Sequence, residues 1–444
     1  MKKILSTFAG GMIAAGLNLA AAPAQAEDLM DVYRLALESD PQLSAAANRL
    51  RSTGEVKRQA WAGFLPTIDA SANYSDTSGD FVLVNGQTGA IGSQQEQLRL
   101  QLSQPLYRRE TYTRLDASRA QLAQSEADYA LALNNLMVRV AEGYFGVLTA
   151  EDALRFASAE ETANSRQLEQ AEQRYEVGLT AITDVHEARA SFDRARANVI
   201  VAQNTLDDAR EALRELTGQE ITAVRPLRDD YSLDPPQPAI MTDWVDSAVS
   251  ANPSVLSRKF AADAAYHNIK TQRAGHYPSL NANVTYQDTT SSGDLGPFST
   301  ETQNFTSIGV TLNVPIYAGG AVTSRTRQAA ADYDAALDQL EQEKRGVTRT
   351  TRNSYRAVLA GISQVEAFRQ AVVSAQSALE ATEAGFEVGT RTIVDVLLAQ
   401  RTLFQAQRDY SQARHDLVLN RLRLRSGAGS IQVDDLQAVN QDLR

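Results

Sequence analysis

The chain has 444 residues, a formal net charge of -11 at pH 7 and no cysteine. Without cysteine there can be no disulfide, metal-thiolate site or cysteine nucleophile, and the acidic balance disfavours nucleic acid as a partner. An exported chain of this length must then be stabilised by packing and by oligomerisation.

The first 26 residues have the pattern of a secretory signal peptide. Lys2 and Lys3 precede an apolar stretch, and Ala24-Gln25-Ala26 is a small-x-small cleavage site, so we expect the mature chain to start at Glu27. Removing the two lysines changes the balance to 41 minus 54, or -13. No cysteine follows the site, which excludes a lipoprotein amino terminus. No later stretch reaches the roughly 18 apolar residues of a spanning helix, so any membrane insertion must use strands.

The first elements change from a helical to a strand period. A short helical pattern covers 28–38, and Pro41 opens a second helix that ends at about Ala62. Strict alternation then predicts strands at 67–76 and 97–107. Each is about as long as the nine to eleven residues with which a tilted strand crosses an outer membrane. A half-solvated hairpin on a soluble domain fits the alternation equally well.

A very long helix follows the second strand. Residues 109–177 contain no proline and only two glycines, Gly143 and Gly146, which predicts a helix of about 100 Å with a coiled-coil-like apolar seam. Gly178 ends it in a tip at 177–184, and a return helix runs to 216.

The same order then repeats after a proline-rich linker at 218–240. Matching motifs recur at offsets of 210 to 212 residues, which indicates a duplicated unit. The first repeat is 27–217 and the second is 241–428. The second contains strands at 279–288 and 307–317, a long helix at 320–388, a tip at 389–395 and a return helix to 425. The remaining residues, 429–444, form a short polar tail to which we assign no role.

The second tip carries a local stop and start signal. Gly389 ends the long helix, and Thr392 can cap the next one, with Asp395 in the position of a capping-box acid.

The predicted fold is therefore α+β with four strands per chain, and it is an α+β membrane protein if these strands span a bilayer. Four strands cannot close a barrel, since the smallest outer-membrane barrels have about eight, and an open edge in lipid leaves backbone groups unsatisfied. Two chains would supply eight strands and three would supply twelve. Because eight strands leave an interior filled with side chains, a duct favours three or more chains.

At this point the chain resembles a known family. The strand-to-helix junctions Pro105-Leu106-Tyr107 and Pro315-Ile316-Tyr317, the tips Val177-Gly178-Leu179 and Val388-Gly389-Thr390, and the run from Gly389 to Leu397 are similar to the outer membrane efflux protein family. The resemblance covers about 28–427. It implies a homotrimer in the bacterial outer membrane, with a 12-stranded β-barrel continued by an α-helical tunnel across the periplasm.

The resemblance also implies partners. They are a periplasmic adaptor (membrane fusion) protein and an inner-membrane pump of the RND, ABC or MFS class, in multidrug efflux or type I secretion, with no cofactor. The tips Val177, Gly178, Leu179, Val388, Gly389 and Thr390 match the positions that meet the adaptor.

The resemblance places a gate at the tips. Asp395 matches an axial aspartate that forms a ring of three carboxylates, which attracts multivalent cations. A second aspartate ring is expected three residues on, but this chain has Leu398 there, so strong block by trivalent cations is not expected. Without the resemblance, Asp395 and Asp184 would be read as first-turn acids facing a helix dipole; the resemblance favours the gate for Asp395 and, less strongly, for Asp184.

A latch between the tips is also implied. Arg391 matches an arginine that ties the second tip to Thr183 and Asp184 of the first, and the alternative is a solvated surface charge. Phe386 stands where relatives often have a tyrosine, so the latch lacks a hydrogen bond worth roughly 0.5 to 1.5 kcal/mol. We expect a looser closed state.

Enzymatic chemistry finds little support. The four histidines show no metal-ligand spacing, and no Gly-rich phosphate loop follows a strand. They are His186, His267, His276 and His415. The alternative to a duct is a soluble periplasmic coiled-coil adaptor or scaffold without pore activity.

Overall fold

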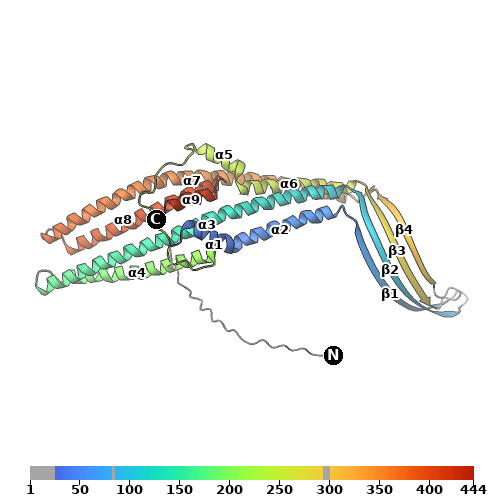
Figure 1. Cartoon of the computed structure of the whole chain (residues 1–444), viewed down its shortest axis with the longest axis horizontal. Coiled ribbons are helices and arrows are strands. Elements are labelled where there is room, and N and C mark those ends of the chain that lie inside the picture. Colours follow the sequence, from blue (N-terminus) through green and yellow to red (C-terminus); the bar gives the residue numbers. More distant parts are fainter. Residues whose placement is uncertain (1–25, 83–85, 294–300) are drawn as a thin grey trace, which may run out of the picture.

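The computed structural model describes residues 26–82, 86–293 and 301–444 (Figure 1). All but the last residue of the predicted signal peptide therefore lies outside the described residues. Two long helical hairpins lie at one end of the molecule and a four-stranded sheet at the other. Both hairpin tips lie at the end farthest from the sheet.

The elements follow the duplicated order. The first repeat contains α1 (Leu29–Ser39), α2 (Pro41–Ala62), β1 (Thr67–Val82), β2 (Thr88–Arg108), α3 (Arg109–Glu176) and α4 (Ile182–Thr217). The second contains α5 (Met241–Ala251), α6 (Pro253–Arg273), the 3-10 turn η1 (Ala274–His276), β3 (Ser279–Gly293), β4 (Glu301–Asn313), α7 (Ala321–Glu387) and α8 (Ile393–Gly427), followed by α9 (Val433–Gln441). Within the described part of the chain, none of these helices combines the length and apolarity needed to cross a bilayer.

Local capping explains where the short helices begin. Asp40 accepts a hydrogen bond from the Leu43 N–H (2.9 Å) and Pro41 takes the first position of α2. Asn252 and Pro253 do the same for α6 in the second repeat. Asp40 is also buried and forms an ion pair with Arg139 of α3 at 2.6 Å.

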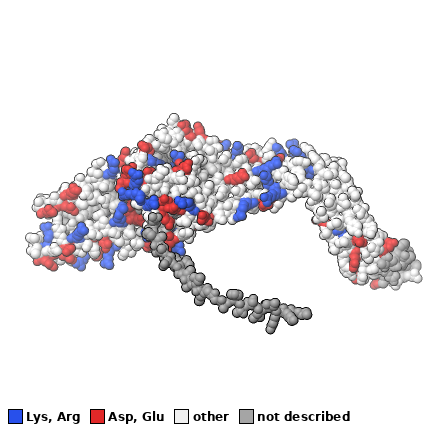
Figure 2. Space-filling view, viewed as in Figure 1, with Lys and Arg blue, Asp and Glu red and all other residues white. Residues whose placement is uncertain are grey.

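The strands form one antiparallel sheet in the order β1-β2-β3-β4. Register aligns the apolar positions across all four strands, so that Ile68 pairs with Leu102, Leu102 with Val284, and Val284 with Ile308. The neighbouring pair in the register, Asp69 with Gln101, is polar and points to the opposite face of the sheet. Ile68 is 67% exposed and Ile308 is 79% exposed. One face of the sheet is thus apolar and uncovered, and Figure 2 shows few charges on the sheet compared with the helices.

Three of the strands extend beyond their predicted ends towards the loops. β1 continues to Val82, β2 begins at Thr88 and β3 continues to Gly293, because backbone pairing persists through glycine-, serine- and glutamine-rich sequence with no apolar alternation. β1, with 16 residues, spans roughly 53 Å, which exceeds the hydrocarbon thickness of a bilayer.

β4 is displaced relative to the prediction. It covers Glu301–Asn313, so the predicted strand end at Pro315 and Tyr317 lies beyond it, in an irregular segment before α7. Proline has no N–H to donate to the sheet. In the first repeat, Pro105 and Tyr107 do lie inside β2, at a register shift that keeps the strand paired up to Arg108.

The main core lies midway along the molecule and includes the C-terminal residues. It packs α1 and α9 against α3, α4 and α8, with Leu213, Val418 and Leu436 completely buried. Leu443 pairs with Leu227 of the linker in an isolated bridge, and Asn440 donates to Asp28 at 3.1 Å. The interpretation of 429–444 as a tail without a role was wrong: these residues form α9 and close the core.

Candidate functional site

The second tip is a tight turn fixed by Gly389. Its φ of 77° is the left-handed conformation that glycine adopts without penalty. The N–H groups of Thr390 and Arg391 then turn back to the carbonyl oxygen of Gly385, at 2.8 and 3.2 Å. Gly389 thus ends α7, and α8 begins four residues later at Ile393.

Thr392 and Asp395 form the predicted capping box at the start of α8. The Thr392 N–H donates to Asp395 Oδ2 at 2.9 Å, and the Asp395 N–H donates to Thr392 Oγ1 at 3.3 Å. The hydrogen bond from the Thr392 backbone, followed by that from its hydroxyl and by the charge of Arg391, holds the pKa of the Asp395 carboxyl below its usual range. Oδ1 takes no part in the cap, so the carboxylate keeps one oxygen for other contacts.

Exposed apolar side chains occur at both tips. Leu398, one turn further along α8, is 61% exposed, and Val388 is 75% exposed. Val177 and Leu179 at the first tip are 69% and 70% exposed. Both tips therefore present uncovered aliphatic side chains beside the glycines that form their turns.

The first tip has the same turn but a different cap. Gly178 has a φ of 74°, yet Ala181 at the start of α4 has no side chain with which to cap it. Asp184 instead accepts a hydrogen bond from the Thr180 hydroxyl, and Thr183 is exposed. The capping box is thus a feature of the second tip.

The predicted latch partners are not bonded within one chain. In the described part of the chain, Arg391 forms no side-chain hydrogen bond or ion pair with Thr183 or Asp184. A Cβ at Gly385 would lie 2.8 Å from Arg391 Cγ, so the glycine provides the space in which the start of the arginine side chain lies.

Phe386 has a partner that the sequence analysis did not identify. The guanidinium of Arg174, near the end of α3, lies 4.8 Å from the centre of the Phe386 ring in α7. Phe386 also packs against the small apolar cluster between α7 and α8 that includes Leu379 and Val396. The contact with Arg174 joins segments more than 200 residues apart, which no local pattern could reveal.

Further from the tips, polar contacts join the two hairpins. Glu160 of α3 is buried and pairs with Arg408 of α8 at 3.1 Å. Ser411 and His415 lie one and two turns beyond Arg408 on α8, nearer the core. Ser411 donates a hydrogen bond to Asp152, and Nδ1 of the buried His415 lies 2.9 Å from Oγ1 of Thr149. The other histidines lie on α4, α6 and η1.

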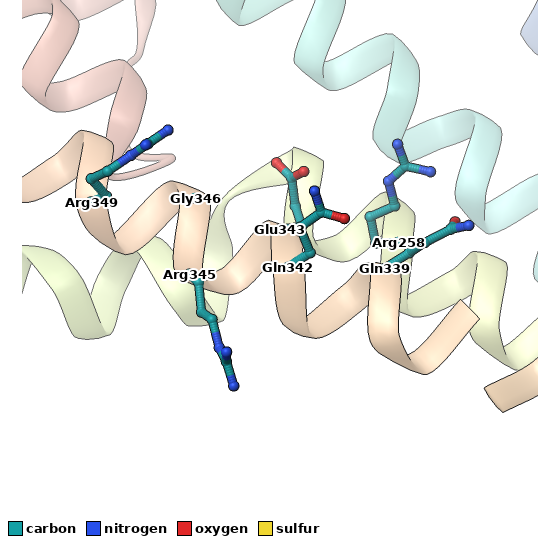
Figure 3. Close-up of a pocket in the computed structure, with 7 residues that line it drawn as sticks. All are labelled: Arg258, Gln339, Gln342, Glu343, Arg345, Gly346 and Arg349. Atoms are coloured by element: carbon teal, nitrogen blue, oxygen red, sulfur yellow. The ribbon is translucent and has the colours of Figure 1, made fainter. Parts of the chain in front are cut away.

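A surface hollow of about 500 Å³ lies between α6 and α7, away from the tips (Figure 3). Glu343 and Arg345 point to opposite sides of α7, and Arg258 extends from α6. The lining is polar and charged and contains none of the predicted site residues. It is formed by Arg258, Gln339, Gln342, Glu343, Arg345, Gly346 and Arg349.

Comparisons with known proteins match this architecture. The chain is 39% identical to the outer membrane protein TolC of Vibrio cholerae, over 100% of this chain and 99% of that protein. It is 30% identical to the alkaline protease secretion protein AprF of Pseudomonas aeruginosa, over 93% and 86% of the two chains. The solved structure of the channel protein CusC superposes with a TM-score of 0.77 at 18% identity, covering 91% and 93%.

A family model matches both repeats separately. The matched segments are residues 32–219 and 244–430, one for each copy of the duplicated unit, and the model describes the outer membrane efflux protein. The chain belongs to the outer membrane efflux protein family.

Proposed function

We propose that this chain is the outer-membrane exit duct of a drug-efflux or type I protein-secretion system. It conducts passively, is closed at the hairpin tips, and works with a periplasmic adaptor and an inner-membrane pump. The observation that carries the proposal is the four-stranded sheet, which is apolar and uncovered on one face and lies at the opposite end from the two tips.

The open edges of the sheet support a trimer. Among the residues that the structure describes, β1 and β4 each pair with a strand on one side only. In a bilayer their free backbone groups need partners, and three chains supply twelve strands to one closed barrel. The relatives TolC and AprF carry names that refer to the outer membrane and to protein secretion, which supports the same assignment.

The duplication supports the same assembly in the helical part. Within the chain, α3 of the first repeat packs along α6 of the second. The equivalent neighbour of α7 is then α2 of an adjacent chain. α2 exposes nearly all its length, with Leu43 and Ala60 as its buried residues and Trp61 54% exposed. Packing of α7 against α2 would cover this surface and close the tunnel.

The tips supply the gate and the docking surface. Asp395 presents its free oxygen beside the exposed Leu398, so three chains would form one acidic ring next to an apolar constriction. The cap lowers the pKa of Asp395 and so opposes the mutual repulsion that raises the pKa of adjacent carboxyls. The exposed aliphatic side chains beside Gly178 and Gly389 fit an adaptor that buries them when it engages.

Single-channel conductance in planar bilayers tests this proposal. Asp395→Ala removes both the charge and the carboxylate oxygen that accepts from the Thr392 N–H and hydroxyl, whereas Asp395→Asn removes the charge and keeps an oxygen for the Thr392 N–H. Both variants should give larger and less cation-sensitive steps than wild type. Asp193→Asn, an exposed acid within α4, is the matched control and should behave as wild type.

One outcome would contradict the duct itself, and another would contradict only the gate at Asp395. If the wild type fails to insert and is absent from the Sarkosyl-insoluble outer-membrane fraction, the protein is not a duct but a soluble scaffold. If both Asp395 variants conduct like the wild type, the duct stands and the constriction lies elsewhere, at Leu398.

A further inference from the structure

The two hairpins have separate apolar cores near their tips. Ala171, Val185 and Ala188 pack between α3 and α4, and a second cluster around Leu379 and Val396 packs between α7 and α8. These clusters share no residue. Near the tips, apolar packing therefore holds each hairpin together without joining one hairpin to the other.

Polar contacts between the hairpins also become sparse towards the tips. Beyond the Glu160–Arg408 ion pair, the described residues contain one further ring or polar side-chain contact from one hairpin to the other, that of Arg174 with Phe386. Arg174 lies 14 residues beyond Glu160, which is about 21 Å further along α3. The contact thus lies at the end of an otherwise unlinked stretch.

Arg174 has no competing partner in its own hairpin. The neighbouring acid Glu172 pairs with Arg189 of α4 at 2.5 Å, which leaves the Arg174 guanidinium to the aromatic ring. Both Arg174 and Phe386 are half-buried. A guanidinium within about 6 Å of the face of an aromatic ring is attracted by the ring quadrupole, and partial loss of water strengthens this attraction.

We propose that Arg174 is a gate residue: its cation–π contact with Phe386 clasps the two hairpins of each chain in the closed state. This inference rests on the proposed duct function and names the residue that holds the gate shut. It also gives Phe386 a positive role, since the ring alone binds the arginine without the hydroxyl that the sequence comparison found missing.

The expected effect follows from the strength of such contacts. Loss of one clasp at a partly exposed site should raise the ratio of open to closed tips about two- to five-fold per chain. If three chains open together, the product is roughly 8- to 125-fold. That range is large enough to measure as an increase in channel conductance or open time.

A double-mutant cycle tests the clasp. Arg174→Gln, Phe386→Leu and the double variant are compared with wild type for conductance in planar bilayers, and for entry of vancomycin into cells. Each single variant should open the channel, and the double should open it no further than the stronger single. Arg174→Lys should restore part of the closure. Arg166→Gln, at an exposed arginine about two turns away on α3, is the control and should leave the channel closed.

The outcomes separate the clasp from the duct. Absence of wild-type channels would overturn the duct, and the clasp with it. A wild-type channel that Asp395→Asn opens but Arg174→Gln does not would overturn the clasp alone, as would strictly additive effects in the cycle. Trimer yield on unheated gels monitors assembly. If one single variant fails to assemble, the other single variant and Arg174→Lys decide the result by the same criteria.

Discussion

His415 should make the stability of the helical region depend on pH. Its side chain is 4% exposed in α8, its Nδ1 lies 2.9 Å from Thr149 Oγ1, and Phe145 packs against its ring at 5.6 Å. Burial lowers the pKa of His415 from its ordinary 6.5 to about 4, and the charge of Asp152 opposes this shift. The charges of Arg414 and Arg155 also lower this pKa, and the value of about 4 is the net result of all four causes.

The sign and the size of the effect follow from linkage. Above pH 6.5 the histidine is neutral in both the folded and the unfolded chain, so its contribution to the free energy of unfolding is fully present. As the pH falls, the unfolded chain binds the proton first, and stability is lost until the folded pKa is reached. With pKa values of 6.5 and about 4, the loss is about 2 kcal/mol per chain at pH 5 and about 3 kcal/mol at pH 4.

Thermal unfolding of the detergent-solubilised trimer at pH 7.5 and pH 5 tests this. The wild type should lose thermal stability on acidification, and His415→Gln, which keeps a hydrogen-bonding group for Thr149 but cannot titrate, should lose less. His186→Gln, an exposed histidine on α4, is the control and should retain the full pH dependence. Equal losses in wild type and His415→Gln would refute the assignment of a neutral, buried histidine.

Three further substitutions test separate parts of the molecule. Asp40→Asn keeps the cap of α2 but removes the charge that Arg139 needs, so it should lower the free energy of unfolding by about 3 kcal/mol, and an unchanged denaturation midpoint would contradict this. Gly389→Ala places an alanine in the left-handed conformation, at a cost of about 1 to 2 kcal/mol, and should reduce drug resistance while channels still form. Gly346→Ala, on α7 where an added Cβ meets no other atom, is the control and should leave drug resistance unchanged. Leu398→Asp adds a second acidic ring and should strengthen channel block by trivalent cations, which a titration of conductance measures.

Local signals predicted the parts of the fold that are local in origin. Pro41 and Pro253 open helices because proline already has a helical φ, and Thr392 with Asp395 forms its capping box within four residues. Gly178 and Gly389 both adopt positive φ at the two tips. Each of these outcomes depends on contacts between near neighbours in sequence, so the pattern alone determines it.

Features that depend on distant contacts could not be predicted in the same way. The outer halves of β1 and β2 have no apolar alternation, and pairing with the neighbouring strand is what extends them. α9 has four apolar residues in a polar stretch, and it is ordered because Leu436 and Leu443 enter a core formed by α1 and the linker. The partner of Phe386 was missed for the same reason, since Arg174 is brought to it by packing of the whole hairpins.

The separate cores near the tips explain how a passive gate can open at low cost. Movement of one hairpin relative to the other beyond Glu160 breaks the Arg174–Phe386 contact but exposes neither apolar cluster, because each cluster moves with its own hairpin. The buried contacts nearer the core, at His415 and Ser411, then serve as the fixed end of that movement. On the clasp proposal, the free energy needed to open is therefore that of a few half-buried contacts, which a docking partner that buries the aliphatic side chains of the tips would supply.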